Sequence, residues 1–77
     1  MSVYDVLQRV KEEKNDLDSN LIKLRGFIYQ NSDLHKLSYA HRSLLETQMH
    51  VMNQYSGILA ERLMHLEHDY DTEDPDA

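Results

Sequence analysis

The stretch from Leu44 to Leu66 is the feature that most restricts how this chain can fold. It contains no proline, and its apolar side chains recur at spacings of three and four, which is typical of a long amphipathic α-helix. Four residues interrupt the apolar pattern, namely Gln48, Tyr55, Gly57 and Arg62. Such a helix needs another helix to cover its apolar side. The interruptions are the places where a function should be sought.

A partner helix is predicted earlier in the chain, over about residues 2–30. Ser2 can accept a hydrogen bond from the first turn, and Asp5 completes the pattern of a capping box. The positions that then follow one another at spacings of four and three are Val3, Leu7, Val10, Lys14, Leu17, Leu21, Leu24 and Ile28. All but Lys14 are apolar, so they form the core-facing seam of a helix pair. Gly26 weakens the last turns, and the helix is expected to end near Gln30 or Asn31.

The second helix is predicted over about residues 39–67, with Ser38 as its N-cap. Its core-facing seam is predicted as Leu45, Gln48, Met52, Tyr55, Leu59, Arg62 and Leu66. The segment NSDLHKLS between the helices has no helical periodicity and contains turn-forming side chains, and Leu34 and Leu37 are expected to close the end of the core. We therefore expect an all-α fold, an antiparallel two-helix hairpin.

Counting outward from the turn gives the expected contacts between the two helices. Apolar pairs are Leu24 with Leu45, Leu17 with Met52 and Val10 with Leu59, and the remaining pairs are Leu21 with Gln48, Lys14 with Tyr55 and Leu7 with Arg62. In this register Lys14 runs along the Tyr55 ring and reaches its phenol oxygen. Arg62 is expected within range of Glu13 or Glu61.

An apolar stripe is left over on the second helix after the hairpin has formed. Leu44, Val51 and Ile58 follow one another at spacings of seven, beside the predicted seam. Gly57 stands next to this stripe and would let another backbone approach closely. We therefore predict a homo-oligomeric helical bundle whose interface includes Leu44, Val51, Gly57 and Ile58.

The composition narrows the classes of protein. A chain of 77 residues supports one domain with a small core, and the absence of cysteine excludes disulfides and thiolate metal sites. Residues 1–66 contain equal numbers of acidic and basic residues, so the net charge of -6 arises from residues 67–77, which we predict to be an acidic, disordered tail. No segment has the length and apolarity of a membrane span, which favours a cytoplasmic protein.

Polar residues on the seam are the main candidates for a site. Lys14 and Arg62, together with Arg9, could bind phosphates, and Tyr4 and Tyr55 could stack on bases, so these five are the predicted ligand-binding residues. The alternative is that Lys14, Gln48 and Arg62 only fix the register of the helices.

Other chemistry has less support in the sequence. The sequence contains no motif of a catalytic nucleophile, and the histidines near the C-terminal end of the second helix lack the HExxH order. We therefore expect no catalytic residue, no metal and no cofactor. Binding to nucleic acid is disfavoured because acidic neighbours dilute the basic residues.

Both helical segments resemble a family of small bacteriophage proteins of helical-hairpin type, over about residues 5–66. The resemblance is carried by Arg9 with Glu13, by the run LxKLxxFI from Leu21 to Ile28, and by the run QxxxMxxYxxILxxR from Gln48 to Arg62. More distantly, the hairpin is similar in plan to viral sponge proteins, which oligomerise and sequester cyclic nucleotide signals of antiviral defence. That resemblance implies ligand pockets at subunit junctions, lined by a tyrosine and by lysine or arginine.

Two hypotheses of function follow. In the first, the chain is a non-enzymatic phage accessory protein in the host cytoplasm that counteracts antiviral defence by sequestering a signalling nucleotide. In the alternative, it is an inhibitor of a protein–protein interaction or a structural adaptor, and its helical face binds a host protein directly.

Overall fold

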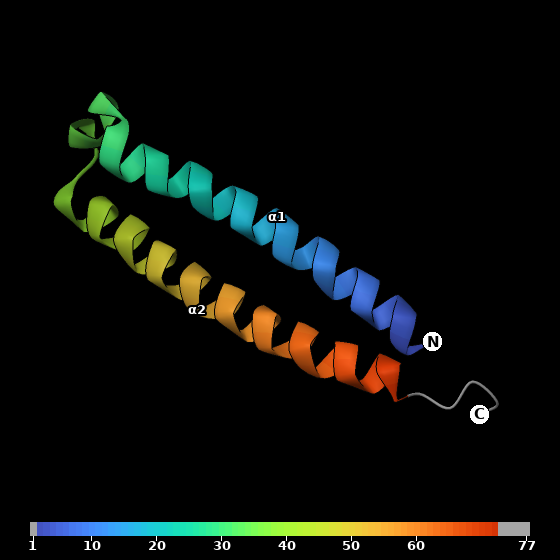
Figure 1. The fold of residues 1–77 in the computed structure, drawn as a ribbon. Coiled ribbons are helices and arrows are strands. Elements are labelled where there is room, and N and C mark those ends of the chain that lie inside the picture. The colour runs from blue at the N-terminus through green and yellow to red at the C-terminus, as the bar shows by residue number, and fades with distance from the viewer. Residues whose placement is uncertain (1, 73–77) are drawn as a thin grey trace.

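The structure, a computed structural model, describes residues 2–72 and contains two long helices joined by a short one. Helix α1 spans Val3–Gln30, the 3-10 helix η1 spans Ser32–Lys36, and α2 spans Tyr39–Asp71. Helices α1 and α2 run antiparallel, so the two ends of the described chain lie together, far from the turn (Figure 1). The molecule measures 60 × 17 × 15 Å. This arrangement confirms the predicted all-α hairpin.

Side-chain caps at the helix ends explain where the helices begin and stop. The Ser2 hydroxyl accepts from the Asp5 amide at 3.1 Å, and the Asp5 carboxylate accepts from the Ser2 amide, which completes the predicted capping box. At the start of α2 the Ser38 hydroxyl accepts from the His41 amide at 3.1 Å. Asn31 ends α1 in an extended conformation, and its side chain accepts from the Asp33 amide to start η1.

Helix α2 continues further than predicted. It ends at Asp71 instead of near residue 67, so the first residues of the predicted acidic tail are helical. The Tyr70 ring lies against the Tyr4 ring of α1, with 5.8 Å between the ring centroids. This aromatic contact ties the last turns of α2 to the start of α1. Residues 73–77 of the predicted tail lie outside the described part of the chain.

The core is a single seam between α1 and α2, and the predicted seam of α1 is confirmed at every position. On α2 the prediction is wrong at alternate positions, because Gln48, Tyr55 and Arg62 are exposed. The residues of α2 that face α1, all buried or half-buried, are Arg42, Leu45, Met49, Met52, Ser56, Leu59, Leu63 and Leu66. This seam keeps the spacings of three and four, but it replaces two polar residues by Met49 and Leu63, which bury more apolar area.

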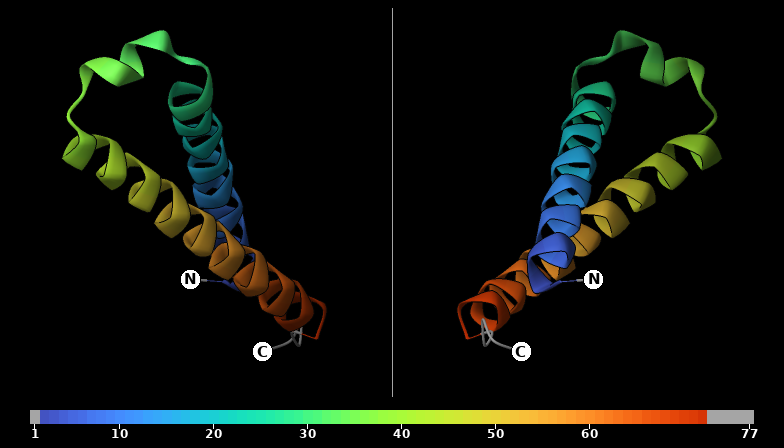
Figure 2. Two further views of the ribbon diagram at one scale, coloured as in Figure 1. Left: turned by 90° about the vertical axis from the view of Figure 1, so that its left-hand side faces the viewer. Right: turned by 90° about the vertical axis from the view of Figure 1, so that its right-hand side faces the viewer.

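The two helices cross at an angle and move apart toward the turn, where η1 bridges the space between them (Figure 2). Long side chains fill the wider end of the seam, since Leu21, Ile28 and Met49 form one buried cluster with the half-buried Leu24, Leu45 and Met52 against it. Leu34 and Leu37 are half-buried at this end. None of the helices within residues 2–72 is long and apolar enough to cross a membrane.

Candidate functional site

A polar layer interrupts the seam halfway along the hairpin. The Lys14 ammonium donates to Asp18 Oδ2 at 2.6 Å and to the Ser56 hydroxyl at 3.3 Å, and the Ser56 hydroxyl donates to Asp18 Oδ1 at 2.6 Å. All three side chains are half-buried. The hydrogen bond with Lys14, followed by that with Ser56, lowers the pKa of Asp18 below its ordinary value, and partial burial opposes them. The layer therefore gives the Lys14 ammonium hydrogen-bond partners inside the hairpin. Because these partners come from both helices, the layer fixes one register of α1 against α2.

This lowered pKa predicts how the fold responds to acid. Because the folded-state pKa of Asp18 lies below 3.8, its ionised form stabilises the hairpin at pH above that value, and the contribution is lost as pH falls through the folded-state pKa. Asp18→Asn should lower the urea concentration at which half of the protein is unfolded at neutral pH. The difference in this midpoint between the variant and the wild type should become smaller in acid. Asp16→Asn, on an exposed position of the same helix, is the control. A difference that stays constant with pH would contradict the prediction.

Tyr55 lies next to this layer but outside the seam. Its phenol donates a hydrogen bond to Glu13 Oε1 of α1, so the predicted contact between Tyr55 and Lys14 is replaced by one with the preceding residue. The hydrogen bond with Glu13 is the main cause that raises the pKa of Tyr55 above its ordinary value of 10.0, and the charge of Arg62 acts in the opposite direction. Glu13, Tyr55 and Arg62 thus share one electrostatic environment.

The raised pKa can be measured directly by alkaline titration. The protonated phenol is the donor, so its contact with Glu13 is present below pH 10.0 and is lost as pH rises through the higher folded-state pKa. Tyr55 should therefore contribute a late component to the ultraviolet absorbance of the phenolate. Tyr55→Phe should remove this late component, and Tyr29→Phe should retain it. Loss of the component in Tyr29→Phe would show that it belongs to another residue.

The bond between Tyr55 and Glu13 marks one side of the hairpin, which we call the Tyr55 face. It consists of Arg9 and Glu13 on α1 and of Val51, Tyr55, Ile58 and Arg62 on α2. Arg9 lies on it because it precedes Glu13 by four residues, and the α2 residues lie at spacings of three, four and seven from Tyr55. Val51 is 56% and Ile58 55% exposed, so this face combines a ring and cations with exposed apolar side chains.

Of the five predicted ligand-binding residues, Tyr55 and Arg62 are close enough for the charge of Arg62 to act on the Tyr55 phenol, and Arg9 lies one helical turn before Glu13, the hydrogen-bond partner of Tyr55. Lys14 lies in the polar layer, and Tyr4 lies against Tyr70 near the end of the hairpin that is far from the turn. The predicted oligomer-interface residues are all exposed on α2, and Leu44 continues the stripe one heptad before Val51. A Cβ at Gly57 would meet nothing within 4 Å, so no contact within the described chain requires glycine there.

Sequence reasoning missed Asp18 and Ser56, although both could have been found. Asp18 follows Lys14 by four residues, the spacing of a helical ion pair. Ser56 falls on the same seam as Met49 and Leu63, and that seam has fewer polar positions than the one predicted. Within residues 2–72, no three histidine or acidic side chains are grouped so that they could hold a metal ion.

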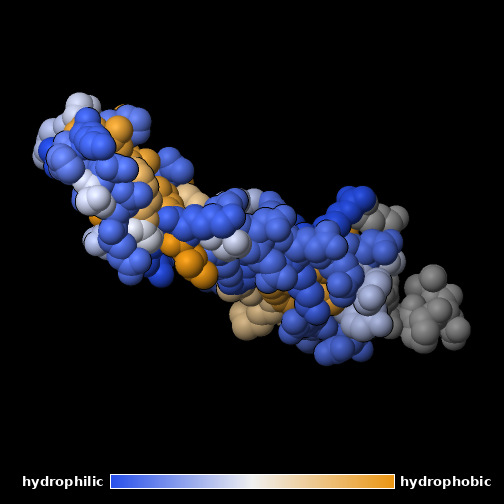
Figure 3. All heavy atoms as spheres, turned by 90° about the horizontal axis from the view of Figure 1, so that it is seen from above, coloured by the Kyte–Doolittle hydropathy of each residue, from blue (hydrophilic) through white to orange (hydrophobic). Residues whose placement is uncertain are grey.

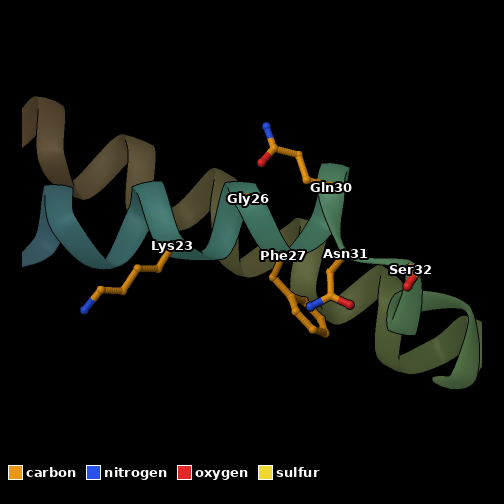
Figure 4. Close-up of a pocket in the computed structure, with 6 residues that line it drawn as sticks. All are labelled: Lys23, Gly26, Phe27, Gln30, Asn31 and Ser32. Carbon is orange, nitrogen blue, oxygen red and sulfur yellow. The ribbon is translucent and has the colours of Figure 1, made fainter.

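A hollow of about 510 Å³ lies beside the end of α1 and has little of the character of a binding site. Its lining side chains do not converge, because Phe27 and Asn31 lie side by side whereas Lys23 and Gln30 extend in other directions (Figure 4). Carbonyl groups at a helix C-terminus also disfavour an anion. Viewed from above α1, the surface is mainly hydrophilic, with hydrophobic atoms gathered toward the turn and along one edge nearer the middle (Figure 3).

Comparison with known proteins gives one family. Searches among curated proteins and solved structures give no match. The family model named Sequestin matches residues 4–65, which include the whole Tyr55 face and every seam residue except Val3 and Leu66. The match covers most of the chain, and the name denotes a protein that sequesters. The chain therefore belongs to the Sequestin family.

Proposed function

We propose that the protein is a non-enzymatic phage accessory protein that counteracts host antiviral defence by sequestering a signalling nucleotide within a homo-oligomer. The observation that carries the proposal is the composition of the Tyr55 face, where the charge of Arg62 acts on a tyrosine ring and where Arg9 and an exposed apolar stripe belong to the same side of the hairpin. Family membership supports sequestration, since the name Sequestin denotes it. Sequestration requires only tight binding and no bond-making residue.

The chemistry of the Tyr55 face suits a phosphorylated ligand that contains a flat ring. Guanidinium groups bind phosphate oxygens through paired hydrogen bonds, and Arg62 and Arg9 are cations on this face. Tyr55 is 39% exposed, so part of its ring is available for a base to stack on. Glu13 accepts a hydrogen bond from the phenol and thereby holds the side chain in place.

A single hairpin leaves this ligand open to solvent, so the proposal includes a second copy. Leu44, Val51 and Ile58 run along the same side of α2 and are each more than half exposed. Covering them with another hairpin would bury apolar surface and enclose the edge that carries Tyr55 and Arg62. Gly57 next to the stripe permits close approach of the second backbone.

A thermal-shift screen tests the proposal. Purified protein is mixed with a panel of cyclic nucleotides and ADP-ribose derivatives, and one ligand should raise the melting temperature by several degrees. A ligand at 100 times its Kd stabilises the native state by about 2.7 kcal/mol, which is enough for such a shift in a small domain. Arg62→Gln and Arg9→Gln should each reduce the shift. Lys11→Gln removes a charge from another side of α1 and should leave it intact.

The outcome also separates the two hypotheses of function. If no ligand changes the melting temperature, and if the same protein retains one host protein from a lysate, the adaptor hypothesis replaces the nucleotide hypothesis. If a ligand raises the melting temperature but Arg62→Gln and Lys11→Gln reduce that shift equally, the Tyr55 face is not the binding site.

A further inference from the structure

A smaller and more enclosed hollow, of about 180 Å³, lies at the turn end of the hairpin. Residues from all three helices line it, namely Ile28, Leu34, Tyr39, Arg42, Ser43 and Glu46. At this end of the hairpin α1 and α2 move apart (Figure 2). The hollow is therefore built from the turn and from both helix ends.

Arg42 is the unusual residue in this hollow. It occupies a core-facing position of α2, and the positions that follow it at spacings of seven are Met49, Ser56 and Leu63, two of which are apolar. Its Nε is buried and has no hydrogen-bond partner among residues 2–72. A buried donor without a partner costs stability, and an apolar residue would avoid that cost. The position thus carries a donor that the hairpin itself does not use.

We infer that this hollow binds the phosphoryl group of a small phosphorylated ligand. The planar guanidinium of Arg42 matches the oxygens of a phosphate, and Ser43, whose hydroxyl can donate a hydrogen bond, lines the same space. Ile28 and Leu34 supply apolar walls, which strengthen a charge-assisted hydrogen bond by excluding water. Tyr39 is 78% exposed at the rim, where its ring can contact the remainder of the ligand.

The volume limits what the hollow can hold. It is several times the roughly 30 Å³ of a water molecule, but it is smaller than the roughly 300–1,000 Å³ of pockets that enclose a whole small molecule. The head group therefore enters, and the remainder of the ligand stays outside. Arg42 precedes Tyr55 by thirteen residues, or about 20 Å along the helix, so this site is separate from the Tyr55 face.

Glu46 provides a second test, in which a substitution should strengthen phosphate binding instead of weakening it. Glu46 lines the same hollow, one turn after Arg42, and its carboxylate would repel an anionic ligand. Replacing it with glutamine removes that repulsion and keeps a side chain of similar size. If the hollow binds phosphate, Arg42→Lys weakens binding and Glu46→Gln strengthens it.

The experiment follows the Nε–H signal of Arg42 in nitrogen-15 NMR spectra. Sodium phosphate, adenosine monophosphate and sodium acetate are titrated at constant ionic strength. Phosphate and adenosine monophosphate should shift the signal saturably, whereas acetate should bind at least about tenfold more weakly. Tighter binding of adenosine monophosphate assigns the site to an organic phosphate, and equal binding assigns it to the head group alone.

Variants are compared through the backbone amides of Tyr39 and Ser43. Arg42→Lys should weaken phosphate binding about tenfold or more, because lysine lacks the planar fork, and Glu46→Gln should tighten it several-fold. Lys36→Gln removes an exposed positive charge at the same end and should change nothing. An Nε–H signal that does not move, acetate binding as tight as phosphate, or an equal loss in Lys36→Gln and Arg42→Lys would overturn the inference. These outcomes do not depend on any nucleotide binding to the Tyr55 face.

Discussion

Leu59→Ala should lower the free energy of unfolding by about 2–5 kcal/mol, the usual cost of truncating a fully buried leucine. Leu59 is 0% exposed, and the register places it against Val10 of α1, which is 3% exposed. A chain of 77 residues typically has a total stability of about 4–12 kcal/mol, so this loss is a large fraction of it. Truncating Leu59 leaves a cavity in the single seam between α1 and α2, with no second layer of core side chains behind it among the described residues. Urea denaturation at one fixed protein concentration measures the change.

Met64→Ala is the matched control for this prediction. Met64 lies on the same helix, five residues later, and is 61% exposed. Truncating it should change the free energy of unfolding by no more than about 0.5 kcal/mol. If Leu59→Ala costs no more than Met64→Ala, the seam described for α2 is not the one that holds the hairpin together.

The fold could be predicted closely because local signals and long-range pattern agree in this chain. Ser2 with Asp5, Asn31 and Ser38 mark helix ends by hydrogen bonds within a few residues, and those signals do not depend on tertiary structure. The end of α2 could not be predicted in the same way. There the helix is extended by the contact of Tyr70 with Tyr4, two residues far apart in sequence.

The seam of α2 was harder to predict because two sets of positions fit the same spacing. Both sets share Leu45, Met52, Leu59 and Leu66, and they differ by one residue at the positions between. Local periodicity cannot choose between Tyr55 and Ser56, because the choice depends on which residue faces Lys14 and Asp18 across the seam. Arg42 was missed for a related reason, since only the structure shows that its Nε is buried at the turn end.

The same one-residue shift changes what the interruptions in Leu44–Leu66 mean. Gln48, Tyr55 and Arg62 do not break the core, because they lie on its flank beside Leu44, Val51 and Ile58. Polar and apolar side chains therefore alternate along a single exposed side of α2. In the function proposed above, association and ligand binding would therefore use one surface.

Val51→Asp combined with Ile58→Asp should convert the proposed oligomer to a monomer of 9.1 kDa without unfolding the hairpin. Both side chains are more than half exposed, so the aspartates do not enter the seam, but in an assembly each would place a charge in an apolar contact. Light scattering after size exclusion measures the mass, and circular dichroism measures the helix content.

A double variant on another side of the hairpin makes this test specific. Ile22 and Tyr29 are each 67% exposed, lie seven residues apart on α1 and line a common hollow away from the Tyr55 face. Ile22→Asp combined with Tyr29→Asp removes as many exposed apolar side chains and should leave the mass of the oligomer unchanged. If this variant dissociates while Val51→Asp with Ile58→Asp stays assembled, the copies meet through α1. In that case the Tyr55 face remains open to solvent, and a nucleotide bound there could not be enclosed between subunits.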